Sequence, residues 1–168
     1  CVLDSLSTGP EMILIAEKLD EYRRQGMTFD AAEAAIRDYM KHPHLVFTLS
    51  SLNNLARNGR VSPLVAKATG LLGIRIVGKA SDVGTLEPIH KPRGEAKALK
   101  VILNHLKECG MCKGKVWISH CENSAAAEML SEMIRQEMPQ TTVQIHSCRG
   151  LCSYYAEKHG LLVGFEKF

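Results

Sequence analysis

The stretch from residue 115 to residue 146 constrains the fold more than any other part of the chain. Two apolar runs, Lys115–His120 and Thr141–His146, each predict a β-strand. Apolar residues at helical spacing between them predict a helix over Ser124–Glu137. A strand, a helix and a strand within so short a stretch indicate a crossover between parallel strands. The sequence therefore predicts an α/β fold (α+β mixed), with a mixed β-sheet flanked by helices.

The rest of the chain shows the same two periodicities. Helices are predicted over residues 11–25, 29–41, 62–72 and 94–108. Thr28 is expected to cap the second of them, because its hydroxyl can accept a hydrogen bond from a free backbone N–H. Ile74–Val77 and Leu86–Ile89 predict two strands joined by a hairpin turn, and the proline of the second indicates an edge position. Val2–Ser5 is expected to be the end of a buried strand, and His42–His44 a solvated helix end.

Composition limits the class of protein. The chain has 168 residues, enough for about one domain, and it is 45% hydrophobic and 23% charged, as is usual for a globular protein. A net charge of +3 with scattered Lys and Arg argues against nucleic-acid binding. No apolar run approaches the length of about 18 residues that a membrane-spanning helix needs, and the first residues lack a signal-peptide pattern. We therefore expect a cytoplasmic protein.

Six cysteines raise the question of a metal or redox site. Cys109 and Cys112 have the C-x-x-C spacing of zinc ligands, and a zinc set could be completed by Cys121, Cys148 and His120. The corresponding enzyme hypothesis is a cysteine nucleophile activated by His120 or His146. Free cysteines also behave as small apolar core residues, and we expect structural thiols here and no metal. The sequence contains no G-x-S-x-G, G-x-x-x-x-G-K or H-E-x-x-H motif, and no catalytic residues are expected.

An apolar strand at Leu45–Phe47 leads into a short helix. Ser50 or Ser51 can cap this helix, and Leu52 and Leu55 lie three residues apart on one of its faces.

The residues that follow are expected to end this helix. Asn58 and Gly59 both tolerate the left-handed backbone of a helix C-terminus. Arg60 therefore falls on a loop, where its guanidinium could pair bidentately with a carboxylate or a phosphate. The alternative is an ordinary surface arginine after a turn.

Three motifs, in this order, resemble those of one known family. Residues 52–62 read L-x-x-L-x-x-N-G-R-V-S and resemble the L-x-x-L-x-x-G-G-R-[IV]-S signature of the DegV family of bacterial fatty-acid-binding proteins, with Asn58 for the first glycine. Residues 70–76 resemble the family's L-L-x-I-K-P-I segment, with arginine for lysine and isoleucine for proline. Residues 91–98 resemble its K-x-R-x-x-K-K-A segment.

The resemblance implies a domain organisation. Residues 1–44 would be the end of the family's first α/β domain, and residues 45–168 its C-terminal lipid-binding domain. Most of the first domain would be missing from this sequence.

The resemblance also implies a carrier rather than an enzyme. Such a protein binds a long-chain fatty acid in an apolar tunnel and presents its carboxylate to a fatty acid kinase for acyl-phosphate formation. It needs no cofactor besides the bound acid, and its role allows transient membrane contact. Arg60 would help to hold the carboxylate, and Ser62 would also be a lipid-binding residue. The tunnel would be lined by Leu64, Val65, Ala68, Leu71, Leu72 and Ile74. Near its end the chain lacks the family's H-x-G-P-G turn, so Tyr155 or His159 would replace its histidine, or Arg149 would supply the second positive group.

Two alternatives stay open at this point. One is an interaction or scaffold domain that keeps the fold and has lost the lipid site. The other is an enzyme or a zinc-binding domain built from the cysteines and histidines.

Overall fold

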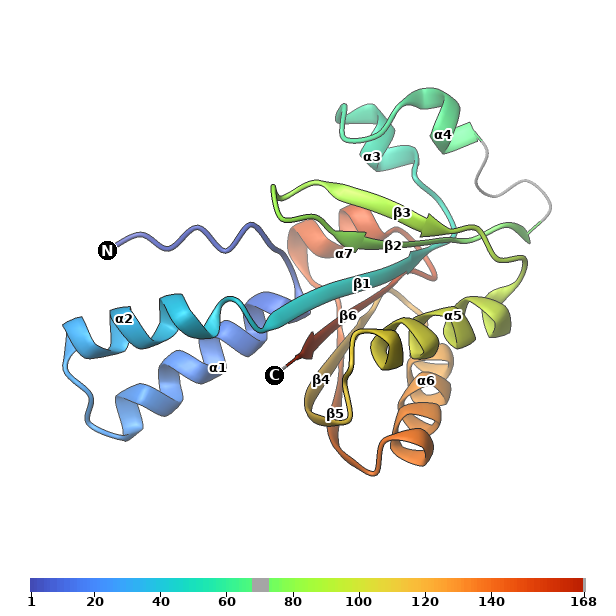
Figure 1. The fold of residues 1–168 in the computed structure, drawn as a ribbon. Coiled ribbons are helices and arrows are strands. Elements are labelled where there is room, and N and C mark those ends of the chain that lie inside the picture. The colour runs from blue at the N-terminus through green and yellow to red at the C-terminus, as the bar shows by residue number, and fades with distance from the viewer. Residues whose placement is uncertain (68–72, 168) are drawn as a thin grey trace.

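A six-stranded mixed β-sheet forms the centre of the molecule (Figure 1). The computed structural model describes residues 1–67 and 73–167. The strands lie in the order β3-β2-β1-β6-β4-β5. Their bounds are β1 Pro43–Leu49, β2 Ile76–Ala80, β3 Leu86–His90, β4 Lys113–His120, β5 Gln140–Ser147 and β6 Leu161–Glu166. The helices are α1 Pro10–Arg24, α2 Phe29–Tyr39, α3 Asn53–Arg57, α4 Pro63–Lys67, α5 Glu95–Glu108, α6 Ser124–Glu137 and α7 Gly150–Ala156.

The predicted crossover is confirmed. β4 and β5 pair in parallel, with Val116 opposite Val143, and α6 connects them. The other neighbouring strands in the described part of the chain pair antiparallel. β3 lies at one edge of the sheet, as its proline predicts. The last strand, β6, lies in the middle of the sheet, between β1 and β4.

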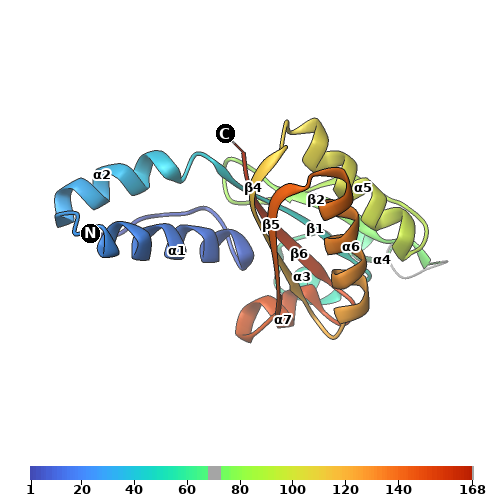
Figure 2. The ribbon, with the colours of Figure 1, turned by 90° about the horizontal axis from the view of Figure 1, so that it is seen from below.

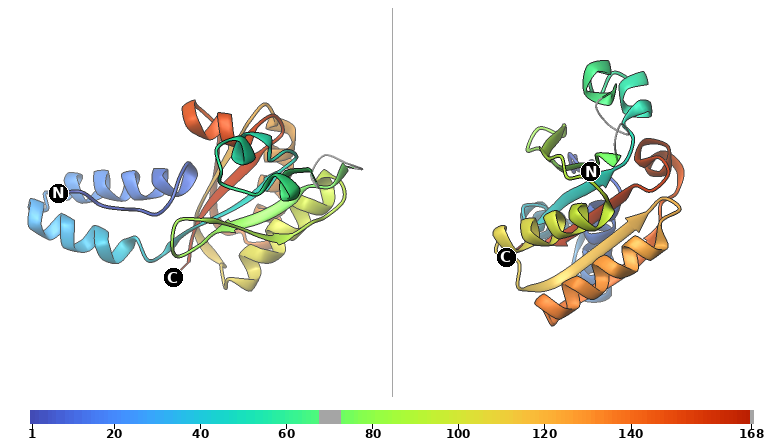
Figure 3. Two further views of the ribbon diagram at one scale, coloured as in Figure 1. Left: turned by 90° about the horizontal axis from the view of Figure 1, so that it is seen from above. Right: turned by 90° about the vertical axis from the view of Figure 1, so that its right-hand side faces the viewer.

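Helices α5 and α6 cover one face of the sheet, and α3 and α7 lie on the other (Figure 3). The inward side of α5 is buried through Ala98, Leu99, Ile102, Leu103 and Leu106. These residues share a core with alternate strand residues, including Val46 of β1 and Val163 of β6. The intervening β1 residues Leu45, Phe47 and Leu49 belong to a second apolar cluster on the opposite face. The alternation along β1 therefore divides the core between the two faces.

Helices α1 and α2 form a hairpin that extends beyond the sheet (Figure 2). The Thr28 hydroxyl caps α2 as predicted, accepting from the backbone N–H of Ala31 at 3.4 Å. The start of α1 lies against β6 at Gly164, where an added Cβ would be 2.6 Å from the carbonyl carbon of Pro10. Further along α1, the carboxylate of Glu17 accepts a hydrogen bond from the Trp117 indole at 3.2 Å. The division of the chain at residue 44 stays a prediction.

Two local predictions were wrong. Val2–Ser5 forms no strand and Val2 is 90% exposed, because no strand of the described residues pairs with its backbone groups. The segment His42–His44 is not a solvated helix end: β1 begins at Pro43, a residue tolerated at the start of a strand. The His44 ring lies 5.6 Å from the Phe165 ring of β6.

The bounds of two further elements can be compared with the predictions within the described residues. The helix expected over residues 62–72 begins at Pro63 and is described as far as Lys67, and its remainder lies outside the described residues. β2 begins at Ile76, and Ile74 forms an isolated bridge with Arg93. Within residues 1–67 and 73–167, no helix combines the length and the apolar character needed to cross a membrane.

Candidate functional site

Helix α3 places Arg60 on a turn after β1. Leu52 and Leu55 are each 2% exposed and anchor α3 to the second apolar cluster. The helix ends at Arg57, and Gly59 adopts a φ of 68°, which glycine tolerates because it has no Cβ. The backbone N–H of Arg60 donates to the carbonyl of Leu55 at 2.9 Å. The predicted loop position of Arg60 is thus confirmed.

Glu157 joins α3 to α7, although the two helices are far apart in the sequence. Its carboxylate accepts from the backbone N–H of Asn54 at 2.8 Å and from the hydroxyl of Ser51 at 2.6 Å. A carboxylate at this point satisfies a free N–H at the start of α3 and complements the positive end of the helix. The Asn54 side chain also donates to the carbonyl of Tyr154 at 2.8 Å. These bonds hold α7 beside α3.

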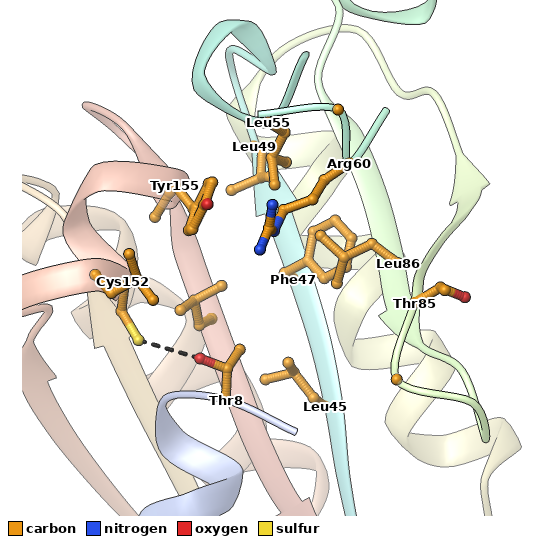
Figure 4. Close-up of a pocket in the computed structure, with 15 residues that line it drawn as sticks. Thr8, Leu45, Phe47, Leu49, Leu55, Arg60, Thr85, Leu86, Cys152 and Tyr155 are labelled. Carbon is orange, nitrogen blue, oxygen red and sulfur yellow. Dashed lines mark hydrogen bonds between the residues drawn. The ribbon is translucent and has the colours of Figure 1, made fainter. Parts of the chain in front are cut away.

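A pocket of about 430 Å³ lies on the sheet face where α3 and α7 lie (Figure 4). Its walls are largely apolar and include Leu45, Phe47, Leu49, Leu55, Leu86, Leu151, Ala156 and Leu162. The lining also includes the more polar residues Thr8, Thr85, Cys152, Tyr155 and Arg60. Arg60 is the one charged side chain among the described residues that line the pocket. The arrangement suits an elongated apolar molecule with an anionic group.

The Arg60 guanidinium points into the pocket between Tyr155 and Phe47 (Figure 4). Its central carbon lies 5.2 Å from the centre of the Tyr155 ring, a cation–π distance. One Nη donates to the carbonyl of Asn58 at 3.0 Å. No carboxylate in residues 1–67 and 73–167 lies within ion-pair distance of it. Arg60 therefore keeps N–H donors for an anion inside the pocket.

Three cysteines, Cys121, Cys148 and Cys152, pack against the second apolar cluster, and Cys152 also lines the pocket. Burial raises the pKa of the Cys148 thiol to about 12 and also raises that of Cys121. A raised pKa disfavours the thiolate that a nucleophile or a zinc ligand needs. Among the described residues, no group of three or more His, Cys, Asp or Glu could hold a metal ion. The packing of these thiols is that of structural residues.

Of the three tail candidates, Tyr155 lines the pocket with Arg60. Arg149 instead lines a neighbouring cavity of about 510 Å³, together with His146. His159 is exposed, and its backbone carbonyl accepts a hydrogen bond from Arg75 at 3.1 Å. The structure thus brings Tyr155 to Arg60 and places the other two candidates elsewhere.

The remaining predicted site residues lie around α4. Ser62 precedes α4, and its carbonyl accepts from the N–H of Ala66 at 3.1 Å. Ile74 is half-buried and, like Ser62, does not occur among the described residues that line the pocket. Of the other predicted tunnel residues, Leu71, Ala68 and Leu72 lie outside the described residues, and the structure does not describe the side chains of Leu64 and Val65.

The second and third motif segments meet in the structure. The Arg75 guanidinium pairs with the Glu95 carboxylate at 2.6 Å. The backbone N–H of Arg75 donates to the carbonyl of Pro92 at 2.9 Å. The N–H of Gly94 donates to the carbonyl of Gly73, also at 2.9 Å. These segments therefore form a structural junction between the entry to β2 and the start of α5.

Sequence reasoning missed most of the pocket wall. The two-residue spacing of Leu45, Phe47 and Leu49 along β1 could have indicated that they share one face, because residues two apart lie on the same face of a strand. Thr8 and Glu157 carry no such signal, since their partners come from distant segments.

Comparison with known proteins identifies relatives over almost the whole chain. A family model described as "Uncharacterised protein, DegV family" matches residues 1–166. A DegV domain-containing protein of Streptococcus pyogenes serotype M1 is 42% identical over 165 residues, which are 98% of this chain and 59% of that protein. A DegV domain-containing protein of Streptococcus pneumoniae (strain ATCC BAA-255 / R6) has the same identity and coverage. The chain thus spans 59% of the length of these curated relatives.

Two solved structures resemble it closely. The Streptococcus pneumoniae Fatty Acid Kinase (Fak) B3 protein, loaded with linoleic acid, has a TM-score of 0.97 and 41% identity, covering 100% of this chain and 60% of that one. A DegV family protein from Eubacterium eligens, loaded with heptadecanoic acid, has a TM-score of 0.96 and 44% identity, covering 99% of this chain and 60% of that one. This chain belongs to the DegV family.

Proposed function

We propose that this chain binds a long-chain fatty acid in the apolar pocket, with the carboxylate at Arg60. The observation that carries the proposal is the Arg60 guanidinium. It points into a pocket with mostly apolar walls, and no carboxylate of the described residues pairs with it.

The two parts of a fatty acid match the two parts of the pocket. Each methylene that moves from water to an apolar surface contributes about 0.8 kcal/mol, which favours an acyl chain along Phe47 and its neighbours. A carboxylate that leaves water needs a charged or hydrogen-bonding partner, and a guanidinium offers parallel N–H donors for its two oxygens. The ligands of the two structural neighbours, linoleic acid and heptadecanoic acid, support this ligand class.

We also propose that the bound acid is presented to a fatty acid kinase, which forms the acyl phosphate. The name of the Streptococcus pneumoniae relative supports this partner. The chain would act as a carrier in the cytoplasm, with transient membrane contact when it takes up the acid. The proposal includes the domain boundary at residue 44. Thr8 would then belong to the first domain and Arg60 to the second, so that one ligand would lie against both domains.

The ligand can be tested directly by native mass spectrometry of the purified chain, followed by organic extraction and mass analysis of what is released. We expect a species of fatty-acid mass. An Arg60→Ala variant should bind an added acid about ten- to a hundredfold more weakly, because a hydrogen bond to a charged group contributes about 1.5–3 kcal/mol.

Arg57→Ala is the matched control. Arg57 is an exposed arginine on α3, and its guanidinium donates to the side-chain oxygen of Asn54 at 3.4 Å. It does not occur among the described residues that line the pocket. Equal loss of acid from both variants would contradict the role of Arg60. A wild-type chain that takes up no added acid would contradict the proposed function.

The kinase step needs its own assay. Purified bacterial fatty acid kinase, ATP and the acid-loaded chain should release ADP, and Arg60→Ala should lower that rate at limiting acid. ADP release that does not depend on the chain would argue against the carrier role.

A further inference from the structure

The cavity that Arg149 lines has a wall of its own, apart from Cys152, which also lines the pocket of Arg60. Its volume is about 510 Å³, within the range of small-molecule sites. We call it the Arg149 cavity. In the described part of the chain it is lined by Gly9, Ile13, Ser119, Ile145, His146, Ser147, Cys148, Arg149 and Cys152. The function proposed above does not use it.

The Arg149 cavity lies where the two parallel strands end. Ser119 of β4 is paired with His146 of β5, and each precedes the last residue of its strand. The start of α1 contributes Ile13 to the wall, and the segment between β5 and α7 contributes Arg149. Ligands of α/β proteins often bind at the carboxyl ends of parallel strands, where the following loops carry polar groups. The position of the cavity is therefore that of a ligand site.

Arg149 gives this cavity a positive charge that no acidic residue of its described lining balances. The residue is exposed, and its side chain forms no ion pair or hydrogen bond with residues 1–67 or 73–167. Burial raises the pKa of the neighbouring Cys148 thiol to about 12, so this thiol stays uncharged. The planar guanidinium presents five N–H donors in a fork that matches a phosphate or a carboxylate.

Ser119 is a second and independent indication of a ligand. The residue is 4% exposed and lines the cavity, yet its hydroxyl forms no hydrogen bond with the described residues. A buried hydroxyl without a partner is costly, and such groups normally bond to water or to a ligand. An acceptor oxygen inside the cavity would satisfy it.

His146 adds a third hydrogen-bonding group. Its ring is stacked on the Trp117 indole, with ring centres 4.3 Å apart and an angle of 20° between the planes. The stacking orients the ring, and its nitrogens form no hydrogen bond with the described residues. Ile13 and Ile145 supply the apolar part of the wall. The cavity thus combines several donors with a small apolar surface.

We propose that the Arg149 cavity binds the phosphoryl group of a small molecule, which pairs with the Arg149 guanidinium and accepts from the Ser119 hydroxyl. A phosphoryl group fits these donors better than a carboxylate, because it offers three strong acceptor oxygens to donors that come from different elements. The group can belong to inorganic phosphate or to an organic phosphate whose carbon atoms lie against Ile13 and Ile145. This inference is independent of the proposed fatty acid function.

The only tryptophan of the chain provides the readout. Because Trp117 is stacked on His146, a ligand in the cavity should change its emission in a saturable way. We expect this for inorganic phosphate and for phenyl phosphate, and calorimetric titration of the whole chain should give the same affinities. Arg149→Gln should weaken the binding of both by about tenfold or more, since hydrogen bonds to charged groups are the strong ones.

Arg57→Gln is the matched control for Arg149→Gln. Arg57 is also an exposed arginine, and it does not occur among the described residues that line the Arg149 cavity. The variant loses the same charge and should bind both phosphates like wild type.

Ser119→Ala tests the buried hydroxyl and should weaken binding about three- to tenfold. Ser131→Ala is its matched control. Ser131 is 1% exposed, and its hydroxyl likewise has no partner among the described residues, but it belongs to α6 and lies outside the described lining. This variant should not change either affinity.

The outcomes identify the source of the phosphoryl group. Tighter binding of phenyl phosphate indicates an organic phosphate, and equal affinities indicate the free ion; either result supports the inference. A wild type that binds neither probe overturns it, as does unchanged binding in Arg149→Gln. Displacement of the phosphate by a saturated fatty acid also overturns it, because the cavity would then hold the carboxylate. Fatty acid binding by the wild type, followed by native mass spectrometry, tests the proposed function separately.

Discussion

The Arg60 guanidinium lies over the Tyr155 ring, with its central carbon 5.2 Å from the ring centre. Arg60 follows α3 and Tyr155 belongs to α7, so packing between distant segments orients the cation in the pocket. A cation–π contact contributes about 0.5–1 kcal/mol at an exposed site. We predict that Tyr155→Ala weakens fatty acid binding about two- to fivefold, an effect that a titration with a fluorescent fatty acid can measure. Tyr155→Phe keeps the ring face and should bind like wild type, and an equal loss in both variants would refute the ring contact.

Glu11 makes stability depend on pH. Burial at the start of α1 raises the pKa of its carboxyl from 4.5 to about 7, and the hydrogen bond from Ser7 only partly opposes this. The folded chain then holds a proton that the unfolded chain releases above pH 4.5, so this contribution to stability is full below about 4.5 and lost as pH rises through 7. We expect a loss of about 2–3 kcal/mol between pH 4.5 and 8.

Glu11→Gln isolates this contribution because glutamine stays neutral. Urea unfolding of both proteins across that pH range should show a steeper decline for wild type. Parallel pH profiles for the two proteins would show that the Glu11 carboxyl does not titrate in this way.

Tyr39 and Glu166 tie α2 to the sheet. The Tyr39 hydroxyl donates to one Glu166 oxygen at 2.7 Å, and the backbone N–H of Lys115 donates to the other at 2.8 Å. Glu166 is 5% exposed, so Tyr39→Phe would leave a buried carboxylate oxygen without this donor. We expect the free energy of unfolding to fall by about 1–3 kcal/mol in urea titrations. Tyr22→Phe, at a half-buried tyrosine of α1, should cost less than about 0.5 kcal/mol, and similar values for both would contradict the assignment.

Gly164 sets how closely α1 approaches β6. An alanine Cβ there would lie 2.6 Å from the Pro10 carbonyl carbon and 2.7 Å from the Glu11 nitrogen, both of which are backbone atoms. Gly164→Ala should therefore displace α1 and cost about 1–3 kcal/mol or more, as overpacking does. The single tryptophan, Trp117, is 5% exposed and bonds to Glu17 of α1, so its emission should shift to the red. Unchanged stability and emission would show that the junction can relax.

The sequence predicted the elements whose stability is local. The spans of α5 and α6, the cap at Thr28, the parallel pair and the edge position of β3 all follow from spacing or from a single residue type. The motif around Arg60 also placed that side chain on a loop, because Gly59 ends α3 by its own backbone preference. The wrong predictions concern two segments whose structure depends on pairing with distant parts of the chain, namely Val2–Ser5 and the start of β1.

Only the tertiary structure decided what surrounds Arg60. β6 lies between β1 and β4 and places Leu162 in the pocket wall, and Glu157 brings α7 to α3 from more than ninety residues away. Thr8 and Thr85 then line the pocket at the end away from Arg60. Spacing along a chain encodes the face of a helix or strand because that face repeats every few residues. It does not encode which distant segments meet, since those contacts depend on the packing of the whole sheet.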